Sequence, residues 1–338
     1  MSKKLLGSLE LNRIYQFDCL EGLKLLPDNC INTCVTSPPY FGLRDYGVDG
    51  QIGLEETPEK YVEKMVDIFR EVRRVLKDDG TLWLNLGDSY AGSNKGYSGK
   101  GKWSVREGTK QSTNKGSIGL LPTKSKEIGL KSKDLIGIPW MVAFALRNDG
   151  WYLRSDIIWE KPNAMPESVK DRPTKAHEYI FLLSKSPKYY YDADSIREPY
   201  QSKPTNKLRD KNAEGYQADY TKGDRFSAGA RNYYSKGKRN KRTVWKVSTK
   251  PFKGAHFATF PPDLIEPCIL AGCPEEGIVL DPFMGSGTTA IVALKNNRNF
   301  IGFEINPKYI EIANMRIEAA YNEIDDQKIL KNSGLLDS

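Results

Sequence analysis

Few residues in this chain of 338 could hold a metal ion. The sequence has two histidines, His177 and His256, and five cysteines, none of which are spaced as a CxxC pair. A structural zinc ion needs four Cys or His ligands, usually in closely spaced pairs. We therefore expect no metal site, and we expect the cysteines to be reduced and buried.

Long apolar runs are missing as well. The longest one, around residues 138–146, is far shorter than the roughly 20 residues that cross a bilayer as a helix. Residues 1–6 contain two lysines but neither a sustained apolar core nor a small-residue cleavage site. We therefore predict a cytoplasmic protein without a membrane segment.

Positive charge is concentrated in two stretches. Residues 91–133 hold ten Lys or Arg against two Asp or Glu, and residues 201–250 hold fourteen against four, whereas the whole chain has a net charge of only +8. Cationic segments on an otherwise acidic body favour a polyanionic partner, because contacts to phosphate release counterions. The alternative is a pair of ordinary solvated insertions.

Hydrophobic periodicity predicts alternating strands and helices at both ends of the chain, which is the pattern of one doubly wound α/β sheet. Asp79 and Gly80 should form a turn between a helix and a strand. We expect strands at 12–17, 31–36, 81–86, 151–159, 177–183, 277–280 and 299–303. We expect helices at 20–26, 58–77, 138–147, 262–270, 288–296 and 307–320.

A glycine-containing turn, DPFMGSGTT at residues 281–289, lies between an apolar strand and a helix. Gly285 and Gly287 permit unusual backbone angles and close approach of a ligand, and the helix start offers free N–H groups. Glu304 ends the next strand, where an acidic residue bonds ribose hydroxyls in doubly wound folds. The turn lacks both a P-loop lysine and the third dinucleotide glycine. We therefore expect a nucleotide-like ligand other than ATP or NAD.

A second motif, the tetrad Ser37-Pro38-Pro39-Tyr40, follows the predicted strand 31–36. Ligands bind at the carboxyl ends of strands in open sheets. The prolines fix the backbone and leave the carbonyls of Ser37 and Pro38 outside any helix or ladder. The Tyr40 ring can stack on a planar base. The alternative is a rigid loop corner or a short polyproline ligand for a partner domain.

Together, the tetrad and the glycine turn resemble the motifs of the beta-class DNA amino-methyltransferases, the cytosine-N4 and adenine-N6 enzymes of the SPPY or DPPY type. The tetrad precedes the glycine turn, with a long basic stretch between them, which resembles the circular permutation of this class. The resemblance covers residues 12–320. It implies a Rossmann-like methyltransferase sheet with inserted basic DNA-recognition loops, S-adenosylmethionine as the cofactor and no metal.

The resemblance also implies roles for individual residues. The catalytic residues would be Ser37, Pro38, Pro39 and Tyr40. The cofactor-binding residues would be Asp18, Phe257, Asp281, Phe283, Gly285, Ser286, Gly287, Thr288 and Glu304. Residues 252–261 resemble a segment that closes over methionine, and residues 157–163 resemble the hairpin beside the base pocket. The densest basic cluster, expected to bind DNA, is Lys238, Arg239, Lys241 and Arg242.

The implied reaction is methylation of an exocyclic amino group on a flipped base in double-stranded DNA. Ser37 and the Pro38 carbonyl would accept the two amino hydrogens, and positioning and electrostatics would supply the catalysis. Ser37 and residues 41–47 resemble cytosine-N4 enzymes, so we expect cytosine N4 in preference to adenine N6. The alternatives are a catalytically silent nucleic-acid-binding module on the same fold, and methylation of RNA or of a protein glutamine.

The predicted organisation has six parts. They are a catalytic half of the core (1–90), a basic insertion (91–133), a continuation of the core (134–191), a basic target-recognition region (192–250), a cofactor-binding half (251–325) and a tail (326–338). The expected partner is double-stranded DNA, with a cognate restriction endonuclease as a further candidate. Monomer and homodimer are both open.

Overall fold

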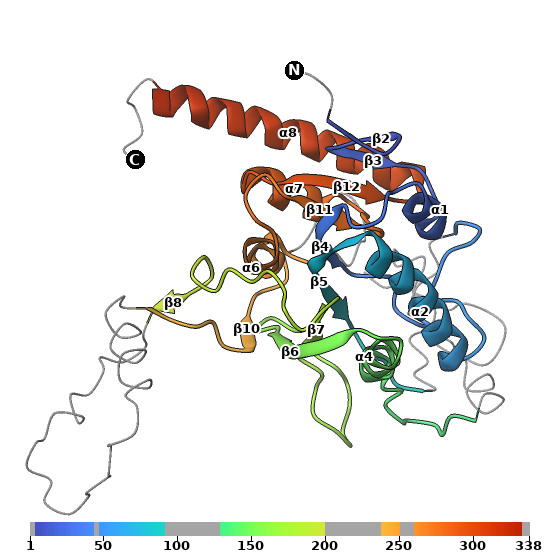
Figure 1. Ribbon diagram of the computed structural model, residues 1–338. Helices are drawn as coiled ribbons and strands as arrows, with labels where there is room; N and C mark the ends of the chain where they lie inside the picture. Colours follow the sequence, from blue (N-terminus) through green and yellow to red (C-terminus); the bar gives the residue numbers. More distant parts are fainter. Residues whose placement is uncertain (1–3, 44–46, 92–128, 200–237, 251–259, 333–338) are drawn as a thin grey trace, which may run out of the picture.

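The computed structural model describes residues 4–43, 47–91, 129–199, 238–250 and 260–332. Its centre is an eight-stranded sheet in the order β10-β6-β7-β5-β4-β11-β12-β3 (Figure 1). All neighbouring strands are parallel except β7, which is antiparallel to both β5 and β6. The strands are β3 (Arg13–Tyr15), β4 (Ile31–Thr36), β5 (Leu76–Leu86), β6 (Tyr152–Glu160), β7 (His177–Ser184), β10 (Val244–Lys246), β11 (Ile278–Asp281) and β12 (Asn299–Phe303).

Helices cover both faces of this sheet (Figure 1). Side chains of β5 alternate between two cores, so that Leu82 and Leu84 face one helical layer and Trp83 faces the other. This arrangement confirms the predicted doubly wound α/β sheet. The first layer holds α1 (Cys19–Lys24), α2 (Pro58–Val75) and α4 (Ile138–Asn148), and the second holds α6 (Pro262–Gly272), α7 (Thr288–Lys295) and α8 (Pro307–Asn332).

Helix α2 shows how the sequence specifies these elements. Thr57 caps the helix by accepting a hydrogen bond from the Lys60 N–H at 3.2 Å, and Pro58 takes the first helical position. The apolar residues recur at a helical period, which places Tyr61 and Phe69 on one fully buried face. Burial of that face against the sheet holds the helix in place.

Three predicted elements need correction, and the edge strand β10 was not predicted. β5 begins at Leu76, before the predicted start at residue 81. The carbonyls of Asp79 and Gly80 accept hydrogen bonds from the segment that follows β7, and the register between β5 and β4 shifts here. The expected Asp79-Gly80 turn is therefore an irregularity within a strand. β3 spans only Arg13–Tyr15, and α8 continues to Asn332, beyond the predicted end at residue 320.

Two short antiparallel pairs are separate from the main sheet. β1 (Leu5–Leu6) pairs with β2 (Leu9–Glu10), and β8 (Glu198–Pro199) pairs with β9 (Lys238–Arg239). Much of the two predicted basic stretches lies outside the described residues. Among the helices that the structure does describe, none is long and apolar enough to cross a membrane.

Candidate active site

The carboxyl ends of four neighbouring parallel strands lead into the predicted site residues. β4 leads into the tetrad, β11 into the glycine turn, β12 into Glu304, and β3 into the loop that holds Asp18. This is the edge at which open α/β sheets bind ligands. One cavity lies there, and the predicted residues that line it are Asp18, Ser37, Pro38, Pro39, Tyr40, Phe283, Gly285, Ser286, Thr288 and Glu304.

Some lining residues were not predicted from the sequence. Phe17, Ile305 and Tyr309 contribute apolar or aromatic surface to the cavity. Each follows the end of β3 or β12 by a few residues, and this position after a strand is what could have predicted them from the sequence. Phe260, at the end of the predicted closing segment 252–261, also lines the cavity, whereas Phe257 lies outside the described residues.

Gly285 forms the part of the glycine turn that faces the cavity. Its φ is +52°, a left-handed angle that glycine tolerates best, and a Cβ atom there would come no closer than 3.9 Å to the rest of the fold. Its N–H donates to Glu304 Oε2 at 2.8 Å, and the N–H of Asn306 donates to Glu304 Oε1 at 2.8 Å. Burial raises the pKa of Glu304. The backbone here has room for a ligand to approach closely.

Two predicted cofactor contacts, Asp281 and Gly287, are not among the residues that line the cavity. The buried Asp281 carboxylate accepts hydrogen bonds from the hydroxyls of Thr36 and Thr289, each at 2.6 Å. Burial raises the pKa of Asp281 to about 6. Gly287 faces α8, where a Cβ atom would lie 2.9 Å from the Cβ of Ala313. The side chain of Asp281 thus joins β4 to the glycine turn, and Gly287 permits helix packing.

The tetrad is held at two of its residues. The hydroxyl of Tyr61 on α2 donates to the Pro39 carbonyl at 2.9 Å. The Tyr40 ring packs against the backbone of Gly87, where a Cβ atom would lie 2.4 Å from the ring. The Pro38 carbonyl accepts no hydrogen bond from the described residues. The Pro38 carbonyl, which was predicted from the sequence to be an acceptor, is therefore available to a ligand.

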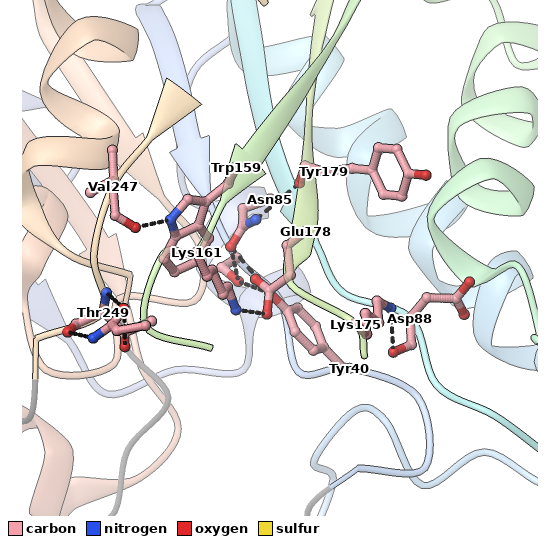
Figure 2. A network of polar contacts seen from close by, with 12 residues as sticks. Tyr40, Asn85, Asp88, Trp159, Lys161, Lys175, Glu178, Tyr179, Val247 and Thr249 are labelled. Atoms are coloured by element: carbon pink, nitrogen blue, oxygen red, sulfur yellow. Dashed lines mark hydrogen bonds and ion pairs between the residues drawn. The ribbon is translucent and has the colours of Figure 1, made fainter. Parts of the chain in front are cut away.

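A polar network surrounds the Tyr40 hydroxyl (Figure 2). This hydroxyl lies 2.8 Å from Glu178 Oε2 and 3.1 Å from Asn85 Oδ1. Lys161 forms an ion pair with Glu178, and its Nζ lies 4.1 Å from the centre of the Trp159 ring. Burial and the neighbouring Glu178 carboxylate raise the pKa of Tyr40 well above its ordinary value. The phenol therefore stays protonated at neutral pH.

Sequence reasoning missed Glu178 and Asn85. Asn85 is near the carboxyl end of β5, whereas Glu178 is near the amino end of β7. Because β7 is antiparallel to β5, its amino end lies at the same edge of the sheet as the cavity. Lys161 follows β6 and belongs to the predicted 157–163 hairpin, which β6 and β7 do form.

The basic cluster is only partly exposed. Arg239 forms an ion pair with Glu198 at 2.9 Å, and its side chain is 14% exposed. Lys241 Nζ lies 5.0 Å from the centre of the Trp245 ring, and Lys238 is exposed. Lys238 and Arg242, which are exposed, are thus better placed than Arg239 to meet a phosphate.

Taken together, the open sheet, the glycine turn and the tetrad at one sheet edge define an α/β protein of the doubly wound class with a site for a nucleotide-like ligand. The N6_N4_Mtase family of DNA methylases matches residues 31–315. The Type II methyltransferase M.Cfr9I of Citrobacter freundii is 47% identical over 312 residues, which cover 92% of this chain and 89% of that protein. M.SmaI of Serratia marcescens is 47% identical over 311 residues, covering 92% of each chain. This chain belongs to the DNA methylase family.

Solved structures share the fold. PvuII DNA methyltransferase, described as cytosine-N4-specific, is 20% identical with a TM-score of 0.57, over 92% of this chain and 91% of that one. A DNA modification methylase from Thermus thermophilus, in complex with S-adenosyl-L-methionine, is 22% identical with a TM-score of 0.55, over 91% and 93% of the two chains. These likenesses confirm the Rossmann-like methyltransferase fold.

Proposed function

We propose that this chain transfers a methyl group from S-adenosylmethionine to the exocyclic amino group of a base in double-stranded DNA, and that the base is cytosine. The observation that supports this proposal is that both the tetrad and the glycine turn line one and the same cavity. Acceptors for an amino group and a site for a nucleotide-like ligand therefore lie side by side.

The cavity suits the chemistry of this cofactor. The side chains of Phe17 and Ile305 offer an apolar wall to an adenine ring, and the Glu304 carboxylate can accept hydrogen bonds from ribose hydroxyls. Gly285 leaves open space beside its backbone where the cofactor can approach. Bound S-adenosylmethionine supplies an electrophilic methyl group.

The chain itself positions the amine. Ser37 Oγ and the Pro38 carbonyl accept the two amino hydrogens, which draws the nitrogen toward tetrahedral geometry and frees its lone pair. After it takes the methyl group, the nitrogen is positively charged and releases one of these two hydrogens as a proton to solvent. The Tyr40 ring, fixed against Gly87, forms a wall on which a flipped base stacks. Positioning and exclusion of water supply the rate enhancement, and no covalent bond to the enzyme forms.

The choice of cytosine rests on Ser37 at the first tetrad position and on the resemblance of residues 41–47 to cytosine-N4 enzymes. We expect nucleoside mass spectrometry of DNA methylated in vitro to show N4-methylcytosine. N6-methyladenine as the sole product would overturn the base assignment. DNA binding without any methylated nucleoside would instead favour the silent module, and methylation confined to RNA or protein would replace the substrate class.

We also propose that the chain protects DNA from a restriction endonuclease, because M.Cfr9I and M.SmaI are named Type II methyltransferases. Single-molecule sequencing of DNA from expressing cells should map the methyl groups to one short sequence. An endonuclease that cuts this sequence should fail on the methylated DNA and cut DNA from cells without the chain. Equal cleavage of both DNAs would contradict a protective role.

A further inference from the structure

The hydroxyl of Ser37 belongs to a network in which hydrogens are scarcer than acceptors. Ser37 Oγ lies 3.4 Å from the Tyr40 hydroxyl and 3.3 Å from Asn85 Oδ1. The Tyr40 hydroxyl in turn lies 3.1 Å from Asn85 Oδ1 and 2.8 Å from Glu178 Oε2. Ser37 and Tyr40 bring one hydroxyl hydrogen each. The assignment of these two hydrogens decides what Ser37 can offer to a ligand.

Two of the acceptors are fixed by contacts outside the network. Asn85 Nδ2 donates to the Tyr179 carbonyl at 2.9 Å, which turns Asn85 Oδ1 toward the hydroxyls. Glu178 is paired with Lys161, and the two side chains are only 16% and 19% exposed. An ionised carboxylate accepts hydrogen bonds and donates none. Figure 2 shows the side chains of Asn85 and Glu178 directed at the Tyr40 hydroxyl.

The hydrogens can therefore be assigned. The single hydrogen of Tyr40 goes to Glu178, because that acceptor is both nearer and charged. Among the described residues, only Ser37 is then left to donate a hydrogen to Asn85 Oδ1. With its own hydrogen directed into the network, Ser37 presents lone pairs alone to the cavity that it lines.

We propose that Glu178, held by Lys161, fixes the direction of these hydrogen bonds and thereby makes Ser37 an obligate hydrogen-bond acceptor for the amino group. The inference rests on the proposed amino-methyltransferase function. Glu178 acts through Tyr40 and Asn85, so it is a positioning residue. It selects a ligand that donates hydrogens at this point, as an exocyclic amine does.

The test is Glu178→Gln. A neutral amide can donate to the Tyr40 oxygen, which allows the Tyr40 hydrogen to turn to Asn85 and the Ser37 hydrogen to turn toward the amine. Turnover on plasmid DNA from a methyltransferase-deficient strain, measured with tritiated S-adenosylmethionine, should fall by roughly 10-fold or more. KM for both substrates should change little. The control is Glu323→Gln, the same change at an exposed carboxylate on α8 that is paired with Lys295 and lies outside the site, which should keep wild-type turnover.

A second substitution separates orientation from mere structural support. Tyr40→Phe keeps the ring but removes the competing hydroxyl, so that Asn85 again receives the Ser37 hydrogen. The double variant Glu178→Gln, Tyr40→Phe should therefore turn over faster than Glu178→Gln alone. A double variant that turns over no faster than Glu178→Gln, or wild-type turnover in Glu178→Gln, would overturn the proposal.

Two further outcomes are informative. If Glu178→Gln does not fold, Tyr40→Phe in the otherwise unchanged chain still decides, because it should lose less turnover than Asn85→Ala, which removes the acceptor itself. The reverse order would overturn the proposal. Absence of DNA methylation by the wild-type chain would instead overturn the proposed function, whatever the variants do.

Discussion

At the scale of single residues, the two glycines of the turn have different tasks although they are two positions apart. Gly285 lines the cavity, whereas Gly287 lies against Ala313 on α8. Both have positive φ angles, +52° and +81°, so any side chain costs each position roughly 1–2 kcal/mol of backbone strain. The difference between the two positions must therefore come from what surrounds them.

We expect Gly285→Val to lose S-adenosylmethionine binding while the protein remains folded, because the side chain fills the space where the ligand meets the backbone. Gly287→Val should lower the melting temperature much more, because it collides with α8. Calorimetric titration and thermal unfolding of the two variants give both comparisons. Wild-type cofactor affinity in a folded Gly285→Val variant would place the cofactor elsewhere.

The same scale shows where sequence reasoning ended. The motif residues Ser37, Tyr40 and Glu304 could be assigned to one site because each follows a strand of the predicted parallel sheet. Glu178 and Asn85 could not, because their contacts depend on which strand lies beside which, and no local pattern encodes that order. The carboxylate of Asp281 bonds Thr36 and Thr289, which the sequence did not predict, and its contact with the cofactor stays a prediction.

At the scale of elements, periodicity predicted the existence of the core helices and of every strand of the main sheet except the edge strand β10. The predicted bounds are wrong for β5, β3 and α8. Hydrogen bonds to distant segments set the bounds of the two strands, and α8 continues as a helix that has no apolar face. The antiparallel direction of β7 was also unpredicted. A buried strand has the same apolar run in either direction.

Asp281 links the neighbouring strands β4 and β11, and that link should depend on pH. Burial raises its pKa to about 6 from an ordinary 3.8, so the folded state binds this proton more tightly than the unfolded chain. The stabilisation is complete below about pH 4 and is lost as the pH rises through about 6. Relative to Asp281→Asn, wild type should lose stability between those values, by on the order of 3 kcal/mol. Denaturant unfolding across this range tests the prediction, and a constant difference would contradict it.

At the scale of the whole molecule, the charge distribution sets how DNA binding responds to salt. Two stretches carry the excess of Lys and Arg in a chain whose net charge is +8. We expect DNA affinity to fall steeply with added salt, because bound cations displace counterions from phosphate.

Neutralising Lys238, Arg239, Lys241 and Arg242 together should make the salt dependence shallower, by about 0.9 in logarithmic slope for each phosphate that is no longer neutralised. Arg239→Gln alone should change the slope least, because this side chain is paired with Glu198. Fluorescence anisotropy with labelled duplex DNA at several salt concentrations measures the slope. A slope equal to that of wild type in the fourfold variant would show that this cluster does not bind phosphate.

The short pair of β8 and β9 has a consequence for the evolution of this protein. Pro199 and Lys238 are register partners, so the chain leaves this pair and returns to it at points about 5 Å apart. Lengthening a segment between fixed neighbouring ends costs little, because closure entropy grows only with the logarithm of length. The 38 residues between these partners can therefore be exchanged for another segment, in a laboratory graft or by recombination between genes, while the catalytic sheet is inherited intact.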